Sequence, residues 1–72
     1  MGIKIKLGKY RHFKGGIYEL LFIAKNSENL REKFAVYRSF ARKHILIRPM
    51  KMFFEEVERD GYQGPRFKYI GK

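Results

Sequence analysis

The stretch "YRHFKGGIYELLFIAK", residues 10–25, holds two extended runs separated by a pair of glycines. Residues 10–13 are predicted to be a strand, residues 14–16 to turn the chain, and residues 17–25 to return antiparallel to the first run. Paired glycines can adopt the positive-φ positions of a tight hairpin turn without steric cost. Because the returning run is apolar on both faces for much of its length, we expect it to be the central strand of a sheet.

Four more segments around this hairpin have the pattern of strands. Apolar and polar residues alternate over residues 3–7, and further extended runs occupy residues 34–40, 45–48 and 65–70. The polar segment between two apolar runs, residues 26–33, is predicted to be a loop. The chain is therefore expected to be mostly β.

One short helix is expected after the strand that ends at Arg48. Pro49 suits the first position of a helix, and the apolar residues at positions 50, 53, 54 and 57 have the spacing of one helical face. Asp60-Gly61 is a strong turn signal. Several short strands with one helical turn, in a chain this small, predict a compact antiparallel barrel.

Length and composition set the class of protein. A chain of 72 residues is too short to divide its core, so we expect a single domain over residues 1–72. The sequence has no cysteine and only two histidines, and we expect no metal and no cofactor. Absence of cysteine, of a signal peptide pattern and of a membrane-length apolar run favours a cytoplasmic protein without membrane contact. Seven Phe and five Tyr predict an aromatic core, with Phe22 inside it.

The charge distribution points to a polyanionic partner. The formal net charge is +10, and residues 1–18 and 38–51 each contribute +5 without a single acid, whereas residues 55–60 contribute −3. Tyrosines are interleaved with these cations, and a surface of basic groups and aromatic rings suits single-stranded nucleic acid. Alternatively, the tyrosines are half-buried barrel residues with only their hydroxyls in water.

The motif blocks of this chain resemble a family of small bacterial proteins, the domain of unknown function numbered sixteen fifty-three. The blocks, in order, are residues 10–15, Tyr18, residues 24–28, 36–37, 47–49, 52–53 and 65–67. The resemblance covers about residues 8–70, and the chain departs from it at Asn26 and Leu46, where the family prefers His and Trp. It implies a cytoplasmic bacterial protein with an SH3-like β-barrel, and it brings no established activity.

Two sets of side chains are candidates for ligand binding. Alternation along the first strand of the hairpin places His12 and Lys14 on one face and Phe13 on the other, so a buried Phe13 would leave His12 and Lys14 facing solvent or a groove. His12 is then either an acid, a base or a hydrogen-bond donor to an anion, or an ordinary surface histidine near a turn. Arg48 and Arg66 adjoin prolines, and each would either bind an anion or clamp a carboxylate such as Glu19, Glu28 or Glu55.

The sequence offers little for catalysis. Ser27 and Ser39 are its only serines, it has no threonine, and neither serine has the setting of an activated nucleophile. We therefore expect a non-enzymatic binding module, most favourably for nucleic acid or a complex containing it. The alternative is an SH3-like module that recognises a protein segment or a small anionic ligand in an aromatic groove. The predicted ligand-binding residues are Tyr10, Arg11, His12, Lys14, Tyr37, Arg48 and Arg66.

Overall fold

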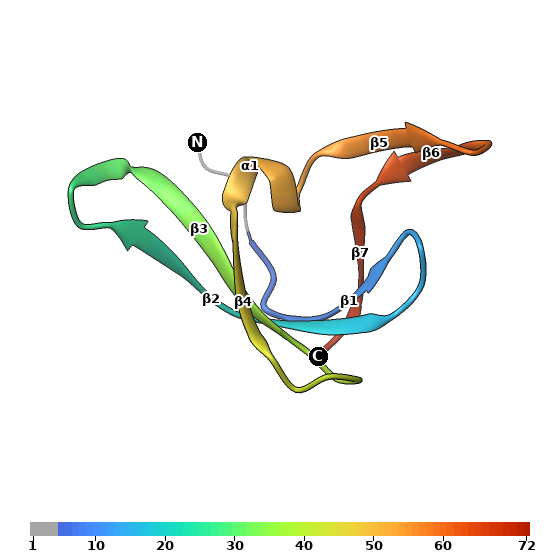
Figure 1. The fold of residues 1–72 in the computed structure, drawn as a ribbon, viewed down its shortest axis with the longest axis horizontal. Helices are drawn as coiled ribbons and strands as arrows, with labels where there is room; N and C mark the ends of the chain where they lie inside the picture. Colours follow the sequence, from blue (N-terminus) through green and yellow to red (C-terminus); the bar gives the residue numbers. More distant parts are fainter. Residues whose placement is uncertain (1–4) are drawn as a thin grey trace.

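The computed structural model describes residues 5–72, which form a five-stranded sheet, a two-stranded ribbon and one short helix (Figure 1). In chain order the elements are β1 (Gly8–His12), β2 (Ile17–Asn26), β3 (Asn29–Ser39), β4 (Ile45–Pro49), α1 (Met50–Phe53), β5 (Glu56–Arg59), β6 (Tyr62–Pro65) and β7 (Phe67–Gly71). All strand pairs are antiparallel. The predicted mostly β fold with one short helix is confirmed.

The glycine hairpin forms as predicted and sits at the centre of the sheet. The strand order is β4-β3-β2-β1-β7, so β2 is the middle strand. At the turn, Gly15 N–H donates to the His12 carbonyl at 2.8 Å and His12 N–H donates to the Gly16 carbonyl at 3.1 Å. Both glycines have positive φ, 100° and 91°, which explains why the turn requires them.

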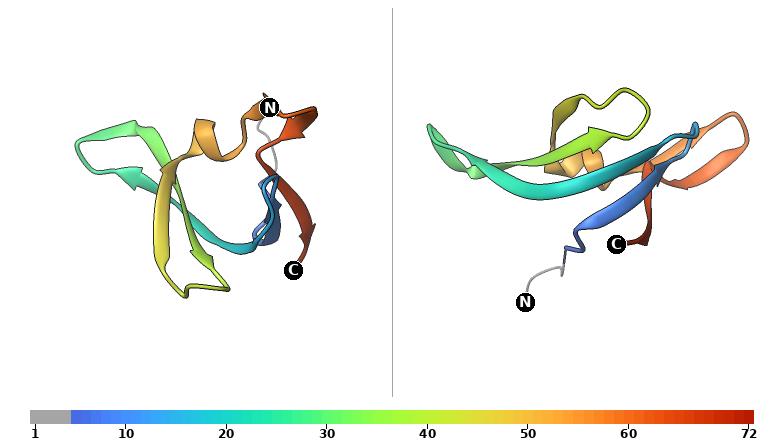
Figure 2. Two further views of the ribbon diagram at one scale, coloured as in Figure 1. Left: turned by 45° about the vertical axis from the view of Figure 1, so that its right-hand side comes forward. Right: turned by 90° about the horizontal axis from the view of Figure 1, so that it is seen from below.

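The sheet is open, so the SH3-like barrel implied by the resemblance is not confirmed. Within residues 5–72, β4 and β7 lie at opposite edges and do not pair with each other. The sheet is strongly twisted, and α1 with the β5–β6 ribbon follows β4 before the chain returns at β7 (Figure 2). None of the helical residues described is part of a segment long and apolar enough to cross a membrane.

Three predicted segments need correction. Within the predicted loop 26–33, the turn takes only Ser27 and Glu28, because the Asn26 side chain accepts the Glu28 N–H at 2.8 Å and lets β3 begin at Asn29. The helix ends at Phe53, and Val57 lies in β5, paired with β6 across the Asp60-Gly61 turn. Of the predicted strand 3–7, residues 5–7 are not a strand and the first two lie outside the described residues.

The core is aromatic, as predicted, and lies on one face of the sheet. Its buried members are Tyr10, Leu20, Ala35, Tyr37, Phe53 and Phe67. The Phe53 and Phe67 rings stack at 4.2 Å between centroids, and both Tyr10 and Tyr37 approach Phe53 edge-on. Phe22 is not in the core: it is 55% exposed, because a β-bulge between Leu20 and Phe22 shifts the register, so that Phe22 faces away from the core and Ile23 packs against it instead. The expectation that β2 is buried on both faces is wrong.

Removing the ring of Phe53 is expected to destabilise the domain strongly. A buried Phe→Ala change costs about 3–5 kcal/mol, so Phe53→Ala should lower the urea midpoint drastically or unfold the domain at 25 °C. The matched control is Phe22→Ala, which removes the same ring from an exposed site and should shift the midpoint little. Circular dichroism during urea unfolding measures both variants. Equal losses of stability would contradict this placement of the core.

Gly8 is expected to tolerate a side chain less well than Gly15. Both have positive φ, 135° and 100°, but a Cβ at Gly8 would lie 2.7 Å from the Gly71 carbonyl oxygen, whereas one at Gly15 would meet nothing within 4 Å. Gly15→Ala should therefore cost only the backbone strain, about 1–2 kcal/mol, and Gly8→Ala clearly more. Thermal unfolding of the two variants ranks them, and the opposite ranking would show that β1 and β7 do not approach so closely.

Candidate functional site

The structure divides the seven predicted ligand-binding residues into three groups. His12, Lys14, Tyr37, Arg48 and Arg66 lie together around the end of the aromatic core, near the β1–β2 turn. Tyr10 is buried in the core, where its hydroxyl donates to the Lys6 carbonyl at 2.6 Å; burial, with a smaller contribution from Tyr69, raises its pKa. Arg11 points to the other face of the sheet, because it alternates with Tyr10 along β1.

His12 is wedged between aromatic rings at the rim of the core. Its ring stacks on Phe13 at 4.7 Å and meets the edge of Phe67 at 4.9 Å between centroids. Its Nδ1 accepts the Lys14 N–H at 3.1 Å, so the neutral ring carries its proton on Nε2. The predicted alternation is wrong here: β1 ends at His12, and Phe13 belongs to the turn, where it is half-buried and stacks on Tyr62.

Arg48 is oriented by the tyrosine and phenylalanine beneath it. Its partner across β3 is Ala35, a fully buried residue, so the Arg48 side chain leaves β4 on the core face. Its Nε donates to the Tyr37 hydroxyl at 3.2 Å, and its guanidinium lies 5.8 Å from the centre of the Phe67 ring. Tyr37 is thus a buried support for Arg48, and its own ring is not on the surface.

Arg66 is a clamp that ties the β1–β2 turn to the segment before β5. Its guanidinium pairs with the Glu55 carboxylate at 2.5 Å, its N–H donates to the Glu55 carbonyl, and its carbonyl accepts the Phe13 N–H. Of the two functions left open by the sequence, the structure shows the clamp. The Arg66 Nε is buried and has no hydrogen-bond partner among residues 5–72, so one donor of this guanidinium is unsatisfied.

The surroundings of His12 keep it neutral. Burial lowers its pKa, and the nearby positive charges of Arg48, Arg66 and Lys14 lower it further. A neutral imidazole that carries its proton on Nε2 is a hydrogen-bond donor in this setting. Nothing described nearby suits it to activate a serine: Ser39 Oγ accepts the Arg42 N–H, and Ser27 lies in the exposed β2–β3 turn. Residues 5–72 contain no cluster of three His, Cys, Asp or Glu side chains that would hold a metal ion.

The opposite face of the sheet carries a group of cations. We call it the outer face, and its basic members are Lys9, Arg11, Arg38 and Lys68. Arg11 is the cross-strand partner of Lys68, and Glu19 is the partner of both Lys9 and Arg38. Glu19 is the acid in this group, and it pairs with Arg38 at 2.7 Å.

A hollow lies beside Phe40 where the outer face meets the β3–β4 turn. Its volume is about 310 Å³, and it is lined by Arg38, Ser39, Phe40, Lys43 and Ile45. The Arg38 guanidinium lies 5.3 Å from the centre of the Phe40 ring, which is 41% exposed. Sequence reasoning missed Phe22 as a surface aromatic because it placed Phe22 in the core, and it noted Phe40 only as the last residue of a predicted strand.

Comparison with known proteins finds a matching family and a solved structure of the same fold. The model of the family described as protein of unknown function (DUF1653) matches residues 8–69. The chain belongs to the DUF1653 family. The family resemblance inferred from the motif blocks is thereby confirmed. A crystal structure of a DUF1653 protein from Bordetella bronchiseptica is similar to this chain with 33% identity and a TM-score of 0.82, over 93% of this chain and 88% of that one. No curated protein matches this DUF1653 chain.

The lowered pKa of His12 predicts how stability depends on pH. Folding lowers this pKa below the ordinary value of about 6.5, so between the two values the unfolded chain binds more protons. The contribution of His12 is therefore fully present above pH 6.5 and is lost as the pH falls from there through the folded pKa. Urea midpoints should fall more steeply below pH 6.5 for the parent than for His12→Gln, and the two should run parallel above pH 7.5. Equal slopes throughout would place His12 in water.

Proposed function

We propose that this DUF1653 domain is a non-enzymatic module that binds single-stranded nucleic acid on its outer face. The observation that carries the proposal is the concentration of four cations on one sheet face around a single acid, next to exposed phenylalanine rings. The sequence prediction of a basic and aromatic surface is kept, but its aromatic members change. Tyr10 and Tyr37 are buried, and Phe22 and Phe40 take the place predicted for tyrosines.

The cations are spaced to follow a phosphate backbone. Lys68, Arg11, Lys9 and Arg38 come from β7, β1 and β3, and neighbouring strands of a sheet are about 4.8 Å apart. A chain of phosphates crossing these strands would meet a cation on three of them. Glu19 offsets one charge through its ion pair with Arg38, so Lys9, Arg11 and Lys68 supply most of the attraction.

The hollow beside Phe40 supports recognition of an unpaired base. A base stacked on an aromatic ring contributes about 1–3 kcal/mol and needs no particular sequence, and a duplex would not expose it. Arg38 and Lys43 line the same hollow and would lie close to the adjoining phosphate. This combination favours single strands over duplex.

The second candidate is recognition of an extended protein segment. The observation that favours it is β4, an edge strand whose exposed Ile45 and Ile47 lie on the outer face. Such an edge can accept an added strand, which is how PDZ and PTB domains bind peptides. We also propose that the open sheet is related to an SH3-like barrel that has opened. The proposal keeps a cytoplasmic location in a bacterium.

Removing two outer-face cations should weaken binding and its salt dependence. In Arg11→Gln/Lys68→Gln, two phosphate contacts are lost, and the slope of log affinity against log salt should fall by about 0.7 for each contact. Fluorescence anisotropy of a labelled oligothymidine between about 50 and 200 mM salt measures this slope. Phe40→Leu should weaken binding without changing the slope, since it removes only stacking.

The control is Lys25→Gln/Arg59→Gln, which removes two exposed cations elsewhere on the chain and so has the same net charge. Its slope should equal that of the parent. If both double variants weaken binding equally, the attraction comes from net charge alone and the outer face is no site. If the parent fails to bind the oligonucleotide at 50 mM salt, nucleic acid is the wrong partner and the β4 edge becomes the better candidate.

A further inference from the structure

A second basic hollow lies away from the outer-face cations, between the far end of the β2–β3 hairpin and α1. β4 pairs with β3 only over Phe34–Arg38, so within the described chain the segment 29–33 of β3 extends past β4 without a neighbour on that side. At Pro49 the chain leaves the sheet and turns into α1. The space left beside this edge of β3 is a groove of about 400 Å³, lined by Asn29, Arg31, Glu32, Lys33, Pro49, Met50 and Lys51.

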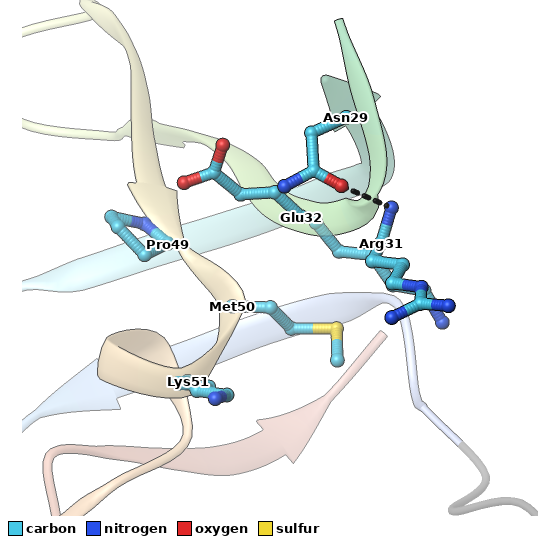
Figure 3. Close-up of a pocket in the computed structure, with 7 residues that line it drawn as sticks. Asn29, Arg31, Glu32, Pro49, Met50 and Lys51 are labelled. Atoms are coloured by element: carbon cyan, nitrogen blue, oxygen red, sulfur yellow. Dashed lines mark hydrogen bonds between the residues drawn. The ribbon is translucent and has the colours of Figure 1, made fainter. Parts of the chain in front are cut away.

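The groove has an apolar floor with cations around it. Figure 3 shows the Met50 side chain lying between the side chains of Arg31 and Lys51, with Pro49 beyond it. The Asn29 side chain accepts the Arg31 N–H at 3.2 Å and so holds the start of β3 against this rim. A volume of 400 Å³ lies in the range of small-ligand sites, and five of the seven lining residues are polar or charged, which suits an anionic ligand.

The groove has more positive than negative side chains. Arg31, Lys33 and Lys51 face one acid, Glu32, whose carboxylate accepts from the Asn26 side chain at 2.7 Å and points away from Arg31 in Figure 3. The ion pairs found among residues 5–72 are those of Arg38 and Arg66, so neither involves a cation of the groove.

A pair of lysines on neighbouring strands adds to this excess of positive charge. Lys33 is the direct cross-strand partner of Lys25. Like charges placed opposite each other on neighbouring strands destabilise a sheet, and an anion held beside them offsets the repulsion. The Lys25–Lys33 pair is therefore electrostatically unfavourable, and an anion bound beside Lys33 would relieve the repulsion.

We propose that this groove binds a small phosphate monoester of nucleotide size. The phosphate lies among Arg31, Lys33 and Lys51, where two lysines act as point charges and the arginine fork donates in pairs. The uncharged part of the ligand packs on Met50 and Pro49, an adaptable thioether beside a rigid ring. None of these residues belongs to the cations or the hollow of the outer face, so the proposal is independent of nucleic-acid binding there.

The experiment is a titration of the isotope-labelled domain, followed by backbone amide NMR at pH 7.5 and constant ionic strength. The probes are adenosine 5′-monophosphate, inorganic phosphate and adenosine. The monophosphate should give saturable shifts centred on Arg31, Lys33, Met50 and Lys51, inorganic phosphate weaker shifts at the same cations, and adenosine none at them. Adenosine shifts equal to those of the monophosphate, or shifts that never saturate, would overturn the proposal.

Two variants with the same net charge distinguish binding in the groove from nonspecific attraction of an anion to a basic protein. Lys33→Gln/Lys51→Gln should weaken monophosphate binding at least tenfold, whereas Arg59→Gln/Lys72→Gln, which has the same net charge and lies outside both proposed sites, should stay within twofold of the parent. A urea midpoint no lower than that of the parent shows that the first variant is folded. Equal weakening in both variants overturns the site.

The same NMR titration with a single-stranded oligonucleotide tests whether the bound phosphate belongs to a small molecule or to a nucleic-acid backbone. If the oligonucleotide shifts Arg31, Lys33 and Lys51 and the monophosphate does not, the groove holds a backbone phosphate and the small-molecule proposal is wrong. Nucleic-acid binding on the outer face is judged separately, by the salt slope of the Arg11 and Lys68 variant. Either proposal can therefore fail while the other stands.

Discussion

The stack of Phe53 on Phe67 is the contact on which the rest of the structure depends. Phe53 comes from α1, which follows the edge strand β4, and Phe67 begins the other edge strand, β7. The two ends of an open sheet are thus joined through side chains where a closed barrel would use backbone hydrogen bonds. Because a domain of this size buries little surface and has no disulfide, these two rings carry a large share of its stability.

Joining the sheet in this way leaves its two faces unequal. The aromatic residues that reach the stack, Tyr10 and Tyr37 among them, all leave their strands on the core face, so the residues that alternate with them lie on the outer face. Arg11 and Arg38 are there by this alternation, and the apolar Phe22 is there because of the β-bulge that follows Leu20. His12 lies at the boundary, in contact with Phe67, and its burial there, together with the positive charges of Arg48, Arg66 and Lys14, lowers its pKa.

Short stretches of the sequence were enough to predict those features of the fold that depend only on residues close together in the chain. The glycine turn, the Asp60-Gly61 turn, the exit of the chain from β4 at Pro49 and the family all followed from short stretches. What failed required knowledge of partners distant in sequence. Phe22 was predicted to lie in the core because nothing in its own strand reveals the β-bulge that turns it to the outer face. Segment 26–33 was predicted to be a loop because it is polar, whereas most of it pairs with β2 after a turn that Asn26 closes. Arg48 and Arg66 were singled out as candidates separate from His12, and the structure places both near it, with Tyr37 as the support of Arg48 and Glu55 as the partner of Arg66.

The net charge of +10 connects the two proposed sites through stability. Most of this positive charge is not offset by acidic side chains. Lys25 and Lys33 place two cations directly opposite each other on neighbouring strands. Repulsion of this kind destabilises a compact state, and it does so most in a small domain with a limited core. Any anion that binds only the folded chain shifts the equilibrium toward it. A basic domain held together by one aromatic cluster therefore has a folded state whose stability depends on its ligands, and the two surfaces where cations meet exposed apolar groups are where that dependence should be strongest.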